Sequence, residues 1–281
     1  MEGGGEQVEQ IEERSILIGG GEMIESRSNT QIKKIQKLKK QAKFRRQEQV
    51  FLVEGFKMTE EALRNGRVRT IYVAEDARTE MEEKLPRVPG EIPVLPVAPS
   101  VFRELADTTT PQGVMAIVEM PSYDRTTLVE QKEAALICLE DIRDPGNLGT
   151  IFRTAEGAGM TAVVLSGGCV DLFNPKVVRA TMGALFRQPF YQVEDMAAEV
   201  RRLRDSGFSI YAATPEAGQD YTACCYEGRT GILIGNEANG LCQETLALAN
   251  EKIRIPMEGE LESLNAAVSA ALLMYEVHRK Q

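Results

Sequence analysis

The second half of this chain alternates short apolar runs with segments of helical pattern, and this alternation constrains the fold more than any other feature. Apolar runs of strand length occupy residues 135–139, 162–165, 190–193, 209–212, 231–234 and 252–255. Strands that are separated by helices form a mainly parallel sheet with helices on both faces. We therefore expect an α/β domain over residues 135–281, with ligands bound at the carboxyl ends of its strands.

A shorter alternating series precedes this domain. Apolar runs at residues 50–53, 70–73, 94–97 and 113–118, with a helical stretch at 56–64, predict a small α/β domain over residues 23–120. Residues 121–134 are expected to be a linker and lead-in. Residues 1–22 lack either periodicity and are expected to be a disordered leader, which leaves open whether Met1 or Met23 is the native start.

Composition excludes several classes of protein. The chain of 281 residues is 43% apolar and 27% charged, which indicates a folded protein, and it has neither a secretory signal nor an apolar run of membrane-spanning length. We expect a cytoplasmic protein with no membrane partner.

The counts of cysteine and histidine restrict the chemistry. Five cysteines without a C-x-x-C pair argue against disulfides and a zinc site, and the single histidine, His278, leaves little room for histidine-based catalysis. No metal is expected.

Positive charge is concentrated near the start of the first domain. The net charge of the chain is −9, yet fourteen consecutive residues contain eight bases and no acid, namely Lys33, Lys34, Lys37, Lys39, Lys40, Lys43, Arg45 and Arg46. Ile32, directly before this segment, and Ile35 and Leu38 within it recur at helical spacing. The pattern predicts a helix with one apolar stripe and a cationic remainder that contacts RNA phosphates, although a solvated surface helix is the alternative. The expected RNA-binding residues are Lys33, Lys34, Lys37, Lys40, Lys43, Arg45 and Arg46.

Three polar clusters follow predicted strands of the second domain. The first places Asn147 at a Pro-Gly turn and Arg153 on the helix that follows, nearly two turns later. The second has Glu237 between Gly235 and Gly240, where glycine permits close backbone approaches. The third runs from Ile255 through Met257 to Ser263, Leu264 and Asn265, just before an apolar helix at residues 266–277. Phosphate-binding motifs of nucleoside triphosphate and dinucleotide sites are absent from the sequence.

The three clusters, in this order, resemble the motifs of the SpoU family of RNA ribose 2′-O-methyltransferases. Asn147, Gly149 and Arg153 match N-x-G-x-x-x-R; Gly235, Glu237 and Gly240 match G-x-E-x-x-G; residues 255–265 match I-P-M-x-G-x-x-x-S-L-N. The segment at residues 173–186 is also similar to the family. The first domain resembles the ribosomal-protein-like substrate-binding domain of the subgroup that modifies large-subunit ribosomal RNA.

This resemblance implies a fold, a cofactor and a site. The fold would be a C-terminal α/β trefoil-knot methyltransferase domain preceded by a small α/β RNA-binding domain, with homodimerisation through the C-terminal domain. S-adenosylmethionine would be bound by Gly235, Ile255, Met257, Leu264 and Asn265. The catalytic residues would be Arg153, Asn147, Glu237, Ser263 and Asn265, with Arg153 either the base that deprotonates the ribose hydroxyl or a group that stabilises the developing alkoxide.

Three functions follow from the resemblance and stay open on sequence alone. The first is S-adenosylmethionine-dependent methylation of a ribose 2′-hydroxyl in ribosomal RNA, 23S in particular. The second is the same reaction on transfer RNA, and the third is a non-catalytic RNA-binding or ribosome-assembly factor. Five intact polar site residues favour an enzyme, and the cationic first domain favours ribosomal RNA. The modified nucleotide, and whether naked RNA or a precursor particle is the substrate, are not determined by sequence.

Overall fold

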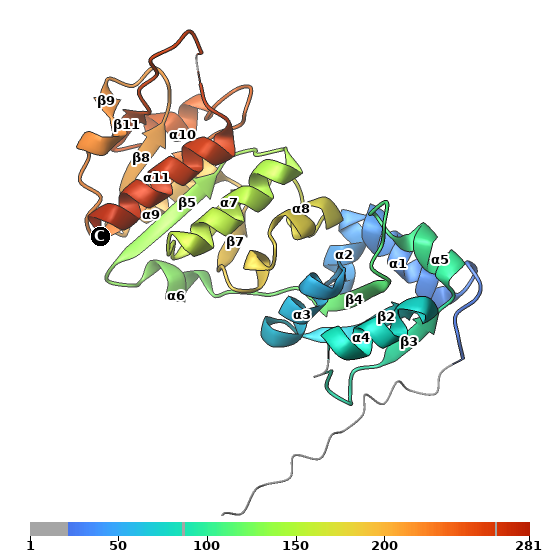
Figure 1. The fold of residues 1–281 in the computed structure, drawn as a ribbon. Helices are drawn as coiled ribbons and strands as arrows, with labels where there is room; N and C mark the ends of the chain where they lie inside the picture. Colours follow the sequence, from blue (N-terminus) through green and yellow to red (C-terminus); the bar gives the residue numbers. More distant parts are fainter. Residues whose placement is uncertain (1–21, 86–87, 262) are drawn as a thin grey trace, which may run out of the picture.

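The structure of the protein is a computed structural model that describes residues 22–85, 88–261 and 263–281. These residues form two sheets, each with its own helices (Figure 1). Nearly all of the expected leader, residues 1–21, lies outside the described residues. No helix within the described ranges is long and apolar enough to cross a membrane.

The N-terminal half contains a four-stranded sheet in the order β1-β4-β2-β3. Its strands are β1 (Val50–Glu54), β2 (Val68–Ala74), β3 (Val94–Val97) and β4 (Val114–Glu119). β4 pairs antiparallel with both β1 and β2, and β2 pairs parallel with β3. The helices are α1 (Thr30–Lys40), α2 (Ala42–Glu48), α3 (Phe56–Asn65), α4 (Arg78–Lys84) and α5 (Pro99–Leu105), with a 3₁₀ turn, η1 (Glu75–Ala77). The four strands expected from the sequence are confirmed.

The cationic segment folds as two helices instead of one. Ile32, Ile35 and Leu38 of α1 are buried, which confirms the apolar stripe. Gln41 then adopts an extended backbone, which ends α1 and lets α2 begin at Ala42 in a new direction. The expectation of a single helix was wrong because an exposed run of like charges gives no signal for a break between two helices.

The C-terminal half contains a seven-stranded sheet in the order β7-β6-β5-β10-β8-β11-β9, and every pair of neighbours is parallel. The strands are β5 (Ala134–Leu139), β6 (Ala162–Ser166), β7 (Phe190–Val193), β8 (Ser209–Ala213), β9 (Gln219–Asp220), β10 (Arg229–Ile234) and β11 (Glu251–Arg254). The six expected strands are confirmed. β9 was not expected, because a two-residue strand is too short to show a period.

Helices cover both faces of this sheet, as the sequence pattern predicted. The helices are α6 (Arg125–Val129), α7 (Pro145–Gly157), α8 (Pro175–Ala180), α9 (Met196–Asp205), α10 (Gln243–Ala247) and α11 (Ala266–Lys280), with 3₁₀ turns η2 (Ala184–Phe186) and η3 (Tyr221–Ala223). Alternate residues of β5 face opposite sides: Ile137 packs in the core that includes α7, α8 and α11, and Cys138 in the core that includes α6 and α9. Figure 1 shows α7 and α11 lying together on one face.

The two halves pack against each other directly. Phe51 of β1 contacts Phe173 and Phe186 of the C-terminal half, with ring centroids 5.0 and 5.9 Å apart. α8 contacts β1, and α3 contacts η2. The hydrophobic core is therefore continuous across the junction. The domain boundaries at residues 22, 120 and 134, and the trefoil knot, stay predictions.

Candidate active site

The carboxyl ends of β5, β10 and β11 each lead into one of the three polar clusters. β5 is followed by α7, whose first turn is capped by Asp144, the acceptor for the Asn147 backbone N–H at 2.8 Å. β10 leads into the loop of residues 235–241, and β11 leads through residues 255–265 to α11. Parallel strands that end at one edge of a sheet bring such loops together.

A chain of side-chain hydrogen bonds joins the three clusters. Asn265 donates from Nδ2 to Oδ1 of Asn147 at 2.9 Å, and Asn147 donates from Nδ2 to Oε1 of Glu237 at 2.9 Å. Asn265 also caps α11, because its Oδ1 accepts the N–H groups of Ala267 and Val268 at 2.9 and 3.3 Å. Asn147 therefore uses both ends of its amide, and its position depends on both neighbouring loops.

The loop of residues 235–241 is a tight turn with no space for a side chain at its start. A Cβ at Gly235 would lie 2.2 Å from the carbonyl carbon of Gly240, and Gly240 has a φ of +66°. Asn236 and Gly240 exchange two backbone hydrogen bonds of 3.0 and 2.9 Å across the turn. This geometry gives the physical reason for glycine at both positions.

Asn236 and Glu140 hold this loop against β5, and sequence reasoning missed both. The Asn236 amide donates to the Asp141 carbonyl at 2.8 Å. Glu140 accepts the Cys242 N–H at 2.7 Å and the Thr245 hydroxyl at 2.6 Å. An asparagine two residues after β10 and an acid directly after β5 were the available signals, because polar residues at strand ends often bond neighbouring loops.

Arg153 and Ser263 are not bonded to the other expected catalytic residues. Both side chains are exposed, and neither makes a hydrogen bond or ion pair with any part of the chain that the structure describes. Glu237 accepts from Asn147 and makes no bond to Arg153 in the described part of the chain. Arg153 therefore faces solvent on α7 with its guanidinium available to a ligand.

The expected cofactor residues lie on the loops after β10 and β11. Gly235, Ile255, Met257 and Leu264 are half-buried, and Ile255 packs against the main core. Half-buried apolar side chains on these two loops suit an adenosyl group, because its base needs apolar surface on both faces. The residues present thus fit S-adenosylmethionine.

A hollow of about 410 Å³ is lined in part by the 235–241 loop. Its acidic lining side chains follow β5 and β7 or lie at the start of α9 and α10, and they are Glu140, Asp141, Glu194, Asp195 and Glu244, with Arg143 beside them. None of the expected catalytic side chains lines it. No group of histidine, cysteine or acidic side chains in the described ranges has the arrangement of a metal site.

The cationic surface of α1 and α2 is smaller than the sequence suggested. Lys33, Lys37, Lys40, Lys43 and Arg46 are exposed. Lys34 forms an ion pair with Glu48 at 3.1 Å, and the Lys39 ammonium group lies 2.9 Å from Asp107. These two lysines are partly neutralised.

Arg45 corrects the expected set of RNA-binding residues. Its side chain is only 3% exposed and donates to Oδ2 of Asp171 at 2.9 Å and to the carbonyl of Leu38 at 2.5 Å. The turn at Gln41 points Arg45 toward the C-terminal half. Arg45 thus joins the two halves and is not part of the exposed cationic surface.

The fold and the joined clusters define a member of the α/β RNA methyltransferases, and comparison with known proteins gives the family. Residues 134–275 match the SpoU rRNA Methylase family, and residues 29–116 match the MRM3-like substrate binding domain. The chain belongs to the SpoU rRNA methylase family.

Relatives and solved structures match nearly the whole chain. It is 31% identical to the Bacillus subtilis 23S rRNA (guanosine(2553)-2′-O)-methyltransferase RlmP, over 90% of this chain and 98% of the relative. The human mitochondrial rRNA methyltransferase 3 is also 31% identical, over 84% of this chain and 69% of the relative. The AdoMet-bound rRNA methyltransferase from Sinorhizobium meliloti aligns with a TM-score of 0.79 at 31% identity, over 92% of this chain and 98% of that one.

Proposed function

We propose that this protein methylates a ribose 2′-hydroxyl in ribosomal RNA, 23S in particular, with S-adenosylmethionine as the methyl donor. The single observation that carries the proposal is the hydrogen-bond chain from Asn265 through Asn147 to Glu237, whose central residue shares α7 with Arg153. It supports an organised catalytic site, because three loops distant in sequence converge on one amide. The relatives named above, which act on ribosomal RNA, favour the same substrate.

The residues of the chain would align the ribose and manage one proton. S-adenosylmethionine, when bound by Gly235, Ile255, Met257, Leu264 and Asn265, supplies an already activated methyl group. The ribose oxygen forms the new bond to carbon and loses its proton, so the protein must hold that oxygen in line and stabilise its developing charge. The hydrogen bonds among Asn265, Asn147 and Glu237 would contribute to this alignment by holding the loops of the site in place.

Arg153 is the residue that we assign to the ribose oxygen. A guanidinium is charged under ordinary conditions, so it serves better as a donor to the developing alkoxide than as a base. A phosphate of the RNA beside it would accept the proton. Ser263, two residues before Asn265 in the chain, would orient the ribose or the cofactor through its hydroxyl, while Asn147, Asn265 and Glu237 hold the three loops together.

The exposed lysines of the N-terminal half would bind the RNA backbone. Lys33, Lys37, Lys40, Lys43 and Arg46 offer five solvent-facing cations on α1 and α2, a density that favours phosphate contact. Lys34 is placed beside them but shares its charge with Glu48.

The outer face of α11 would form the homodimer contact. Val268, Leu272 and Tyr275 recur at helical spacing and are 48, 38 and 50% exposed. An apolar stripe of this kind on a helix normally packs against another surface. We also propose a cytoplasmic location, where free cysteines stay reduced and ribosomal RNA is made.

The proposal is tested by methylation of purified ribosomal RNA and transfer RNA with labelled S-adenosylmethionine, followed by mapping of 2′-O-methyl positions. We expect one modified ribose in 23S ribosomal RNA. Modification of transfer RNA alone would show that transfer RNA, and not ribosomal RNA, is the substrate. Cofactor binding without methyl transfer to either RNA would favour a non-catalytic RNA-binding factor.

A further inference from the structure

One segment of the C-terminal half, residues 171–187, carries the contacts described above with the N-terminal half; we call it the junction segment. Asp171 at its start pairs with Arg45, and Phe173 packs against Phe51. Arg187 at its end pairs with Glu61 of α3. The segment resembles the SpoU family in sequence, yet none of these contacts belongs to the three motif clusters.

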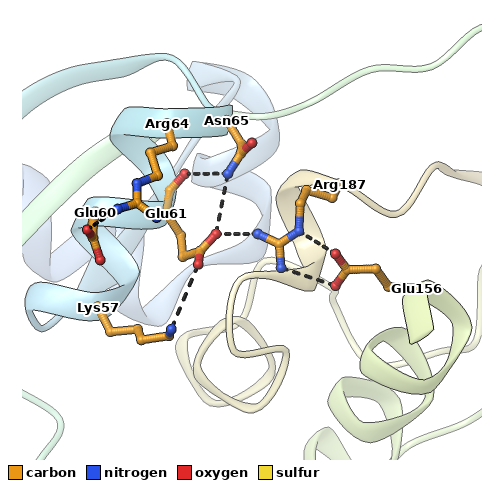
Figure 2. A network of polar contacts seen from close by, with 7 residues as sticks. All are labelled: Lys57, Glu60, Glu61, Arg64, Asn65, Glu156 and Arg187. Carbon is orange, nitrogen blue, oxygen red and sulfur yellow. Dashed lines mark hydrogen bonds and ion pairs between the residues drawn. The ribbon is translucent and has the colours of Figure 1, made fainter.

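Arg187 contacts both halves of the molecule at the same time (Figure 2). Its Nη1 donates to Oε2 of Glu61, and its Nε and Nη2 donate to the two carboxylate oxygens of Glu156 on α7, the second at 3.1 Å. Glu156 holds the pKa of the Arg187 guanidinium above its ordinary value, and Glu61 acts in the same direction. One planar guanidinium therefore joins α3 to α7.

The contact at Glu61 is closely fitted. Glu61 is 13% exposed, and Asn65 donates to its Oε2 at 3.3 Å, which holds the carboxylate toward Arg187. Gly183 of the junction segment has a φ of +95°, and a Cβ there would lie 2.8 Å from Cγ of Glu61. The backbone of the junction segment thus comes against the Glu61 side chain as closely as glycine allows.

α7 is the helix that carries Asn147 and Arg153, so the bridge ends close to the proposed site. Glu156 lies three residues after Arg153, which is about 4.5 Å along the helix axis. The junction segment also packs on α7 through Ala180, since a Cβ at Gly149 would lie 2.3 Å from the Ala180 Cβ. A shift of the junction segment is therefore transmitted to the helix that holds Arg153.

The two ends of the junction segment contact different helices of the N-terminal half, α2 at the start and α3 at the end. Arg45 with Asp171 and the Phe51–Phe173 contact anchor the start of the segment to α2 and β1, and the apolar contact of Phe186 with Phe51 continues along it. Arg187 with Glu61 adds a second point on another helix. Two separated points fix the angle between the cationic surface of α1 and α2 and the Arg153 face of α7.

We propose that Arg187 is a positioning residue for methyl transfer: it fixes the angle between the RNA-binding surface and α7, and so selects which ribose of the bound RNA reaches Arg153. The inference rests on the proposed function. Lysine cannot fully replace Arg187, because the planar guanidinium directs three nitrogen donors at two carboxylates, whereas an ammonium group has no such fixed geometry. Individual half-exposed ion pairs are weak, so the effect is expected to be moderate and visible mainly in turnover and in site selection.

The test compares Arg187→Glu with Arg64→Glu in the full-length protein. Arg64 lies on the same helix as Glu61 but, among the residues that the structure describes, pairs only with Glu60, at 2.5 Å on the α3 surface (Figure 2), so it is a control of equal charge change. We expect Arg187→Glu to lower kcat on 23S ribosomal RNA about tenfold and to increase methylation of neighbouring riboses. Affinities for RNA and for S-adenosylmethionine should stay within twofold of wild type, and Arg64→Glu should be near wild type throughout.

A charge exchange separates positioning from loss of folding. Glu61→Arg and Glu156→Arg combined with Arg187→Glu reverse the sign of both partners and restore both ion pairs of the bridge, and we expect kcat to recover to within about threefold of wild type. If Arg187→Glu does not fold, Arg187→Lys takes its place, with an expected threefold loss in kcat. Wild-type kcat and site selection in Arg187→Glu, or in Arg187→Lys where that variant is used, would overturn the inference, as would a failure of the exchange to recover any kcat. Failure of the proposed function differs from all of these, because wild type itself would then be inactive.

Discussion

The exposed cations of α1 and α2 stand apart from one another in solvent, whereas Asn147, Glu237 and Asn265 of the C-terminal half are bonded in a chain. On the cationic surface each side chain contributes separately to RNA affinity, so the loss of one cation leaves the others in place. The chain in the C-terminal half is a network in which each member fixes the next, so that one loss disturbs three loops. The difference predicts that single substitutions are severe in the C-terminal site and mild on the cationic surface.

Arg153 is the residue that can break this comparison, because it lies in the C-terminal site but is exposed and unpartnered within the described residues, like the lysines. If it acts at the transition state, Arg153→Ala lowers single-turnover methyl transfer about a hundredfold or more, with RNA and cofactor binding nearly unchanged. Arg153→Lys should keep partial activity if charge alone matters. A loss confined to RNA affinity would place Arg153 with the phosphate-binding cations.

The turn at residues 235–241 provides the next largest effect. Gly235→Val places a side chain against the Gly240 backbone, and overpacking of this kind costs about 1–3 kcal/mol. We expect affinity for S-adenosylmethionine, measured by calorimetry, to fall about thirtyfold. Glu237→Gln should weaken binding less, because the proposed cofactor contacts are made by the backbone. The reverse ranking would contradict the geometry of the loop.

Asn147→Asp tests whether the hydrogen-bond chain acts as a unit. The substitution replaces the Nδ2 donor by an oxygen and sets two carboxylates against each other, since Asn147 donates to Glu237 at 2.9 Å. We expect methyl transfer at saturating RNA and cofactor to fall about twentyfold. Asn239→Asp on the exposed part of the neighbouring loop adds the same charge and should have little effect. Equal losses in both variants would show a response to charge alone.

The smallest effect per residue is expected on α1 and α2. Replacing Lys37, Lys40 and Lys43 together by alanine should weaken RNA binding about tenfold at low salt and reduce the slope of log K against log salt by about two to three. Arg64, Arg67 and Arg69 replaced together remove the same charge from side chains that pair with Glu60 or Glu119. An equal change of slope in this control would mean that net charge, and not the α1 and α2 surface, governs RNA affinity.

The strands and the membership of the three clusters were predictable from local pattern. Apolar residues that recur at a regular spacing indicate the buried face of a strand or helix, and glycines indicate a tight turn where a side chain would not fit. Residues 231–240 show both patterns, an apolar run followed by two glycines. The buried stripe of Ile32, Ile35 and Leu38 was visible for the same reason.

What the sequence by itself determined was therefore the α/β class, the six longer strands of the second sheet and the residues of the motifs. The tertiary structure decided which side chains meet. Arg45 and Asp171 are 126 residues apart, as are Glu61 and Arg187, and Asn147 and Asn265 are 118 apart. Such pairs leave no periodic trace, because each depends on the packing of two elements whose relative placement is set by the whole core. Arg45 and Arg46 are the same residue type at adjacent positions, yet one is buried between the halves and the other faces solvent.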